Sequence, residues 1–486
     1  MDIAVVVAIV VFALIGAPLF AVYGAAAVLL FARLPDTPLS GAAHDVFSEK
    51  FADSPILVTI PLFTLSGVVL AESGASRRLV AVSRALFGFM PGGLAIVCIM
   101  ASAVFTTLTG GSGITIIAIG GLLFPILLEE RYPERFSLGL VTTGGSLGML
   151  FPPSLPVIIY GVVASADIQS LYVAALVPGL ITTAVLITYA GAIGLSSKLK
   201  RSPFEPRAAA TALWTAKWEA LLPVALLAGL ALGVLRIHEA AAFTALYVLI
   251  VEIFVYRDIA LSDLPRIIGK CVTLVGAILI ILATAVGFTA YLIQANVPQA
   301  ILEGMQRFIS TKWTFLLALN LFVLVVGTLM EVFSAIVVVV PLVVPIANYF
   351  GVNPYHLGAV FLLNLEIGYL APPVGLNLFL SSLRFERPMA EVYRAVLSFT
   401  LLLFACLLLV TYVPALSIWS PHLAEPLTLG ATRSDRHARS ERPSRASIAP
   451  PLEGNSESGE APANRGETLD DLLDNDGEGE SPKPRD

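Results

Sequence analysis

The sequence predicts an all-α polytopic membrane protein with about eleven transmembrane helices and two re-entrant hairpins. Of its 486 residues, 57% are hydrophobic and only 13% are charged, a balance that soluble chains rarely show. Apolar runs long enough to cross a bilayer recur along residues 1–420. A pattern from Gly to Pro-Pro occurs twice inside such runs, at Gly148 to Pro153 and Gly368 to Pro373, with an offset of 220 positions. The repeated pattern indicates a duplicated membrane domain.

The predicted spans follow from roughly 20 apolar residues per crossing. They lie at residues 3–32, 55–71, 85–108, 136–165, 171–195, 219–236, 239–256, 268–294, 313–330, 356–382 and 396–419. The first run is too long and too weakly charged at its start for a cleaved signal peptide, so we expect it to stay as a helix. Two further apolar stretches, 110–128 and 333–350, each lie close to another long run. We expect them to form re-entrant hairpins, with ordinary spanning helices as the alternative.

The two Pro-Pro segments predict broken helices. Proline removes a backbone donor and disfavours helix at the residue before it, so the runs at 136–165 and 356–382 should break at mid-depth. Backbone groups freed in this way are stable there only where they are buried in protein or line a watery cavity. Paired interruptions in corresponding halves mark the binding sites of transporters.

The charge distribution predicts the domain organisation. Residues 421–486 hold 8 of the 29 Lys and Arg and 14 of the 35 Asp and Glu, which leaves 21 of each sign in residues 1–420. The tail is rich in Pro, Gly and Ser, so we expect it to be disordered; a solvated linker is preferred over an electrostatic contact with lipid or a partner. The basic residues of the linker and those at 77–84 predict that both loops are cytoplasmic. The predicted domains are a first membrane half at 1–195, a basic linker at 196–217, a second membrane half at 218–420 and the tail at 421–486.

Signatures of soluble enzymes and metal clusters are missing from the sequence. The three cysteines lie far apart in apolar runs, without the Cys-x-x-Cys spacing of metal sites, and there is no Gly-x-x-x-x-Gly-Lys-Ser/Thr loop for ATP. We expect no organic cofactor and no nucleic-acid partner. One enzyme alternative stays open, because Gly111-Ser112-Gly113 superficially resembles the tip of a serine protease. His356 is then the candidate base.

Glycine-rich segments are the first candidate sites. Thr109 to Thr115 has the glycines of a tight hairpin tip, which would aim amides, carbonyls and hydroxyls at one point, suited to a carboxylate or a sodium ion. Close helix packing is the alternative. The unwound segments Gly144 to Ser154 and Gly368 to Asn377 offer free carbonyls. Asn377 is predicted either to contact substrate or to tie down the unwound strand, in equal measure.

Two carboxylates in apolar surroundings are further candidates. Glu331 follows a second predicted tip at 327–331, and Glu366 precedes the second Pro-Pro segment. Charges at membrane depth are unfavourable and usually face the bundle interior or a cavity. Either carboxylate would coordinate a cation, relay a proton or bond to neighbouring backbone, and Glu331 is alternatively an interfacial residue.

Together these motifs resemble the large membrane subunit of tripartite ATP-independent periplasmic (TRAP) transporters, the DctM-like permease. The resemblance extends through most of residues 1–420. Its motifs are Ile60-Pro61-Leu62-Phe63, Pro91-Gly92-Gly93-Leu94, Thr109 to Gly120, Gly148 to Ser154, Pro178-Gly179-Leu180, Met330-Glu331, Gly351 to Gly358 and Gly368 to Gly375. It implies an elevator-type secondary transporter of the ion transporter superfamily, with inverted repeats, in the bacterial inner membrane. It also implies two partners, a small membrane subunit and a periplasmic substrate-binding protein, and we expect this chain to carry neither.

The resemblance further implies sodium-coupled uptake of an organic acid, such as a C4-dicarboxylate or a 2-oxo acid, with Na⁺ as coupling ion. A carrier that works without a binding protein is the alternative. The implied sites are sodium site one at Thr109, Ser112, Gly145, Gly148 and Pro152, sodium site two at Gly327, Gly368, Ala371 and Pro373, and a substrate site at Gly111, Ser112, Ser154 and Asn377. The family commonly has Ser at Gly111 and Thr at Ala371, so this chain lacks two hydroxyl ligands.

Overall fold

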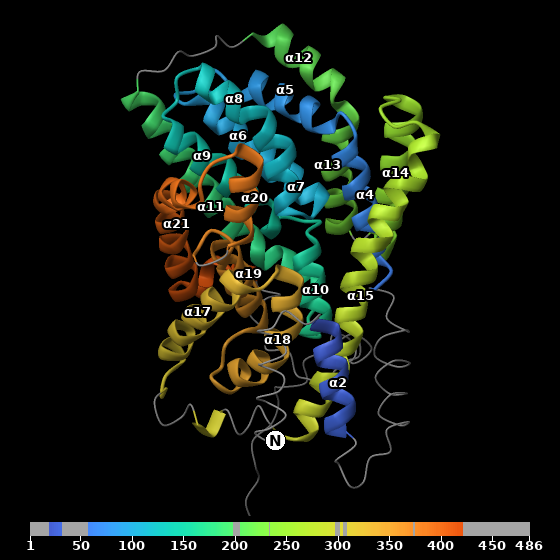
Figure 1. Ribbon diagram of the computed structural model, residues 1–486, viewed down its shortest axis with the longest axis vertical. Coiled ribbons are helices and arrows are strands. Elements are labelled where there is room, and N and C mark those ends of the chain that lie inside the picture. Colours follow the sequence, from blue (N-terminus) through green and yellow to red (C-terminus); the bar gives the residue numbers. More distant parts are fainter. Residues whose placement is uncertain are drawn as a thin grey trace, which may run out of the picture. The chain divides into compact units, whose positions relative to one another are not determined.

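The computed structural model describes residues 19–31, 57–197, 205–232, 234–296, 302–304, 309–372 and 375–420. They belong to one compact unit, Met1–Leu427, whereas the second unit, Thr428–Asp486, lies outside the described residues. Outside them also lie the whole predicted tail at 421–486, residues 198–204 of the predicted linker, and Pro373. All regular elements in the described ranges are helical, which confirms the predicted all-α class (Figure 1).

The helices of the first half and the linker follow one another with short connections. They are α2 (Leu19–Phe31), α4 (Thr59–Glu72), α5 (Ala75–Phe87), α6 (Gly93–Thr109), α7 (Ser112–Thr115), η2 (Ile116–Gly120), α8 (Gly121–Glu129), α9 (Glu134–Gly144), η3 (Leu147–Leu150), α10 (Leu155–Val163), α11 (Ile168–Ser196) and α12 (Pro206–Thr215).

The second half continues in the same manner. Its elements are α13 (Lys217–Ala231), α14 (Ile237–Ile250), η4 (Val251–Val255), η5 (Leu261–Asp263), α15 (Leu264–Gln294), α17 (Lys312–Leu329), α18 (Val332–Tyr349), α19 (Pro354–Gly368), α20 (Leu376–Phe385), α21 (Met389–Tyr412) and η6 (Pro414–Leu416).

The duplication is visible in the helix boundaries. At the same offset of 220 positions, two helices end, two begin, two end and two begin again: Thr109 and Leu329, Ser112 and Val332, Glu129 and Tyr349, Glu134 and Pro354. Each half therefore contains a helix pair with a two-residue tip, α6 with α7–α8 and α17 with α18. In Figure 1, α8 lies near the top and α17 near the bottom.

The tips lie at the beginning of the two stretches predicted as hairpins, not inside them. Residues 112–129 form one continuous helical run, and so do residues 332–349. Each run is the second arm of a helix pair whose first arm is the preceding predicted span, α6 or α17. Whether either pair is re-entrant stays a prediction.

Both predicted helix breaks are confirmed. The first run bends by 47° between residues 134–150 and 155–163. In the second run α19 ends at Gly368 and α20 begins at Leu376. The breaks coincide with Pro-Pro pairs because these residues supply no N–H to continue the helical ladder.

Polar side chains begin several of these helices. The side chain of Asn353 accepts hydrogen bonds from the amides of Tyr355 and His356, with Pro354 at the first helical position of α19. Asp167 accepts from the amide of Ser170 at the start of α11. These local caps fix where the helices after each break region begin.

The number of spans was predicted less well than the fold class. Within the described residues, 7 helices are long and apolar enough to cross a membrane, or up to 9 if each of two bent pairs counts as one span. The predicted count of about eleven is not confirmed, because α4 and α6 are shorter apolar helices. Between 33% and 61% of each candidate span is buried, so large apolar side chains such as Val272 face outward, as expected beside lipid.

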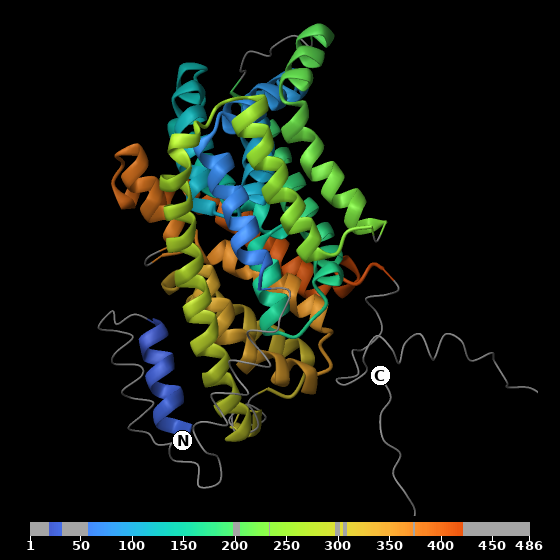
Figure 2. The ribbon, with the colours of Figure 1, turned by 90° about the vertical axis from the view of Figure 1, so that its right-hand side faces the viewer.

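Packing brings distant segments together. Helix α15 lies along α2 and α4, and α14 also packs on α4 (Figures 1 and 2). Helix α21 packs on α9, and α17 on α19. The two basic loops predicted to be cytoplasmic lie at the same end, because α12 packs on α5.

Candidate functional site

The first tip is a turn between α6 and α7 that glycine permits. Gly110 has φ of +68°, a left-handed conformation, and its amide donates to the Thr106 carbonyl at 2.7 Å. A Cβ on Gly110 would lie 2.9 Å from the side chain of Leu155, the first residue of α10. The predicted tip is therefore confirmed, and it lies against the helix that follows the first break.

The first break is held against α6 by close backbone contact and two threonine hydroxyls. A Cβ on Gly148 would lie 2.4 Å from both the Ala103 carbonyl and the Thr107 amide. The hydroxyl of Thr106 donates to the Gly145 carbonyl at 2.9 Å, and that of Thr107 lies 3.2 Å from the Gly148 carbonyl. The sequence analysis did not single out either threonine.

The structure brings most of predicted sodium site one together. A Cβ on Gly145 would lie 2.9 Å from the Ser112 carbonyl, so tip and break meet there. The Thr109 hydroxyl points back along α6 and donates to the Phe105 carbonyl at 2.8 Å. Pro152 is buried in the break. The available cation ligands at this place are therefore mainly carbonyl oxygens.

Predicted sodium site two is also assembled from backbone. Gly327 and Gly368 touch, since a Cβ on Gly368 would lie 2.7 Å from the Gly327 Cα. The Gly375 amide donates to the Thr328 carbonyl at 3.2 Å. A Cβ on Gly375 would lie 2.8 Å from the Ala371 carbonyl and 2.9 Å from that of Tyr369.

Three carbonyls thus converge beside Gly375, those of Thr328, Tyr369 and Ala371. Thr328 and Tyr369 were not predicted as site residues. Among the described residues, no group of three or more His, Cys, Asp or Glu side chains is arranged to hold a metal ion. Any cation held at either break therefore depends on main-chain oxygens, as at the unwound helices of transporters.

Glu331 has a structural partner. Its carboxylate accepts from the amides of Phe333 at 2.9 Å and Ser334 at 3.4 Å, and so caps α18. The amide of Val332 donates to the Tyr369 hydroxyl, which ties the second tip to the second break. Of the roles predicted for Glu331, the geometry shows bonding to neighbouring backbone.

Glu366 differs from Glu331 in having no such partner. Its side chain is fully buried in α19, and neither carboxylate oxygen has a hydrogen-bond partner among the described residues. A buried carboxyl group without a partner is unfavourable when ionised. The backbone role predicted for Glu366 is not formed here.

The predicted substrate residues include two buried side chains without partners. Asn377 is fully buried at the start of α20, and neither its Oδ1 nor its Nδ2 finds a partner among the described residues. The Ser154 hydroxyl, 1% exposed, is in the same position. Buried polar groups are normally hydrogen-bonded, so such atoms call for an explanation. For Asn377, the structural tie that was predicted as one alternative is not formed.

Both side chains flank the first tip. Ser154 precedes Leu155, which touches Gly110, and Asn377 lies in α20, whose Leu380 would lie 2.5 Å from a Cβ on Gly113. Gly111 between them is extended, with φ of −126° and ψ of 114°. The substrate residues predicted from the sequence therefore gather around one tip.

The histidine that the protease alternative requires lies elsewhere. The Nδ1 atom of His356 is 3.1 Å from the Ser417 hydroxyl, at the beginning of α19. A nucleophilic serine needs its base within hydrogen-bond reach. Since His356 pairs with Ser417 and not with Ser112, the protease alternative loses its base.

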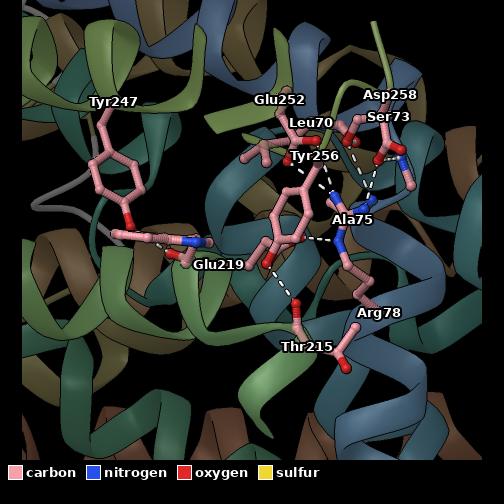
Figure 3. Close-up of polar contacts among 12 residues, drawn as sticks. Leu70, Ser73, Ala75, Arg78, Thr215, Glu219, Tyr247, Glu252, Tyr256 and Asp258 are labelled. Carbon is pink, nitrogen blue, oxygen red and sulfur yellow. Dashed lines mark hydrogen bonds and ion pairs between the residues drawn. The ribbon is translucent and has the colours of Figure 1, made fainter. Parts of the chain in front are cut away.

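A buried ionic cluster was missed by the sequence analysis (Figure 3). Arg78 of α5 donates from Nε to Glu219, from Nη1 to Asp258 at 2.6 Å, and from Nη2 to Glu252 at 2.9 Å. The Arg78 side chain is 13% exposed, and those of Glu219 and Glu252 are 1% and 0% exposed. Burial acts to lower the pKa of Arg78, but its hydrogen bonds to Asp258 and Glu219 prevail, and the pKa is raised above the ordinary value.

This Arg78 cluster joins elements that are distant in sequence. Asp258 also accepts from the Gly74 amide at 2.8 Å, and the Tyr256 ring lies 3.7 Å from the guanidinium. The corner between α4 and α5 is thereby attached to α13 and to η4. The available signal was that Glu219 and Glu252 interrupt apolar runs, where carboxylates usually have partners.

Comparison with known proteins covers nearly the whole described fold. A sequence profile of the family described as "Tripartite ATP-independent periplasmic transporter, DctM component" matches residues 6–416. The C4-dicarboxylate TRAP transporter large permease protein DctM of Pseudomonas aeruginosa is 35% identical over 406 residues, 82% of this chain and 92% of that protein. The isethionate TRAP transporter permease protein DctMQ of Oleidesulfovibrio alaskensis is 32% identical, covering 84% of this chain and 64% of that protein.

A solved structure shares the fold. The crystal structure of the YdaH transporter of Alcanivorax borkumensis superposes with a TM-score of 0.53 and covers 84% of this chain and 97% of that one. The sequences are 16% identical, so this likeness concerns the fold alone.

Proposed function

Because the chain belongs to the DctM component family of tripartite ATP-independent periplasmic transporters, as a large permease subunit, we propose that it carries an organic acid across the bacterial inner membrane by sodium-coupled secondary transport. The observation that carries the proposal is the meeting of a helix tip with a helix break in each half. At the first tip, the buried polar atoms of Asn377 and Ser154 lack described protein partners.

A carboxylate substrate suits the groups around the first tip. The Asn377 amide and the Ser154 hydroxyl supply donors whose desolvation is otherwise uncompensated. Hydrogen bonds to an ionised acceptor are stronger than those between neutral groups. A bound carboxylate would therefore satisfy atoms that this fold leaves unpaired. Relatives named for C4-dicarboxylate support this substrate class.

Sodium would bridge each tip to its break. At site one the carbonyls of Ser112 and Gly145 lie near one another, and at site two those of Thr328, Tyr369 and Ala371 converge. Unwound backbone carbonyls coordinate Na⁺ in secondary transporters. Ion binding would close the first tip over substrate, after which the tips and breaks move together as one elevator-type carrying unit.

Two partners complete the proposed system. The family is described as tripartite, and one relative is named as a DctMQ permease, which supports a small membrane subunit and a periplasmic binding protein as partners here. The apolar outer faces of the candidate spans are available to lipid and to the small subunit. A carrier that works without the binding protein is the second candidate.

The decisive experiment is uptake of labelled organic acids into proteoliposomes that hold this chain and its small subunit. Uptake is expected only with both the binding protein and an inward sodium gradient. Uptake without the binding protein would favour the stand-alone carrier, and uptake that ignores the sodium gradient would refute the coupling.

A variant of Asn377 tests the substrate site. Asn377→Leu replaces an unpaired buried amide by an apolar side chain of similar size, so unfolding stability should be unchanged or higher. Uptake should fall by at least tenfold, as expected when a charge-assisted hydrogen bond is lost. Normal uptake by this variant, or loss of stability together with uptake, would remove Asn377 from the site.

A further inference from the structure

A cavity lies beside the first tip and has not been assigned a role. Its volume is about 710 Å³, and it lies between α4, α15 and the helical run that begins at Ser112. Lining residues include Val68 and Glu72 from α4, Ile114 and Ile117 from the helical run, and Lys270 and Thr273 from α15. The cavity is apolar along most of its wall and charged at one end.

The cavity leads away from the tip. A Cβ on Gly67 of α4 would lie 2.5 Å from the Thr109 carbonyl, so α4 touches the tip directly before its lining residues begin. From there, α4 and the helical run extend toward the same end of the fold, where α5 begins (Figure 1). This is the end predicted to be cytoplasmic.

The far end holds one carboxylate between two cations. Glu72 accepts from Arg266 at 2.9 Å through Oε2 and from Lys270 at 2.5 Å through Oε1. The side chains of Arg266 and Lys270 are 54% and 50% exposed. The two cations are thus spaced to hold one carboxylate by separate oxygens, and the group carries a net charge of +1.

We propose that this cavity is the route by which the carboxylate substrate leaves the first tip, and that Lys270 and Arg266 receive it in exchange for Glu72. The inference rests on the proposed function. Exchanging one carboxylate for another conserves the charge-assisted hydrogen bonds. A cationic group at the mouth of an apolar cleft raises the local concentration of an anion.

Neighbouring charges do not oppose this assignment. The carboxylates of the Arg78 cluster are bonded to Arg78 and do not line the cavity. Arg384 of α20 donates to the Ile117 carbonyl at 3.4 Å and adds a further cation on the helical run.

Thiol labelling tests the sign of the cavity without requiring transport. Thr273→Cys places a reactive group on an exposed lining residue, while the three natural cysteines are buried. An anionic methanethiosulfonate should react several-fold faster than a cationic one of similar size. Adding Lys270→Gln should abolish this preference, whereas Arg207→Gln, an exposed cation of α12, should leave it intact. An unchanged preference in Lys270→Gln would overturn the proposal.

Transport measurements separate the route from a structural ion pair. Lys270→Gln should lower the initial uptake rate about tenfold, while Arg207→Gln should not change it. The double variant Glu72→Gln with Lys270→Gln removes both members of the pair and should stay as slow as Lys270→Gln. Recovery of wild-type uptake by the double variant would show that the pair is only structural. Absence of uptake by the wild-type protein would instead refute the proposed function, and the labelling result would stand by itself.

Discussion

Removal of Arg78 should reveal how strongly the corner between α4 and α5 is attached to the rest of the fold. In Arg78→Gln, three carboxylates lose their shared cation, and two of them are almost completely buried. Breaking a buried ion pair by removing one partner costs about 3–5 kcal/mol. We expect a loss of this size because Glu219, Glu252 and Asp258 then repel one another without compensation.

The loss can be measured as the free energy of unfolding in a detergent titration, followed by tryptophan fluorescence. Trp214 and Trp218 lie in the segments next to Glu219 and report on this region. Arg77→Gln is the matched control, because Arg77 is the exposed neighbour of Arg78 and forms no ion pair with any residue of the described ranges. It should change stability by less than about 0.5 kcal/mol.

Coupling within the Arg78 cluster gives a second check. Glu219→Gln added to Arg78→Gln removes one uncompensated carboxylate, so the double variant should be more stable than the sum of the single losses indicates. A loss below about 1 kcal/mol in Arg78→Gln would contradict the buried-pair estimate. Strict additivity of the two substitutions would show that the cluster does not act as a unit.

Three further substitutions test the tips and breaks. Gly368→Val would force its Cβ to 2.7 Å from the Gly327 Cα, so sodium-dependent uptake should be lost while membrane insertion persists; uptake at the wild-type level would refute the contact. Ala371→Thr adds a hydroxyl beside the second break and should lower the sodium concentration for half-maximal uptake, whereas an unchanged sodium titration would argue against a ligand role there. Glu331→Ala removes the cap of α18 and should cost about 1 kcal/mol of unfolding stability, with Glu331→Asp retaining more of it; no loss in Ala would contradict the cap.

The sequence alone was sufficient to locate the two helix breaks and the first tip. Pro152-Pro153 cannot supply the amides that a helix requires, and Gly110 adopts the left-handed conformation that other residues disfavour. The offset of 220 positions, read from the Pro-Pro pairs, predicted the repeat that the helix boundaries display. These features are local or periodic, so they can be recognised without knowing what packs against what.

Only the tertiary structure decided which distant groups meet. Arg78 bonds to Glu219, Glu252 and Asp258, which lie 141, 174 and 180 positions further along the chain. A carboxylate in an apolar run indicates an unfavourable burial, but nothing local identifies its partner. The same reason explains why the roles of Glu331 and Asn377 stayed open until α18 and α20 were placed: one side chain found helix amides and the other found no described partner. Chain chemistry therefore determined where the helices stop, whereas packing determined which polar groups are satisfied within the protein.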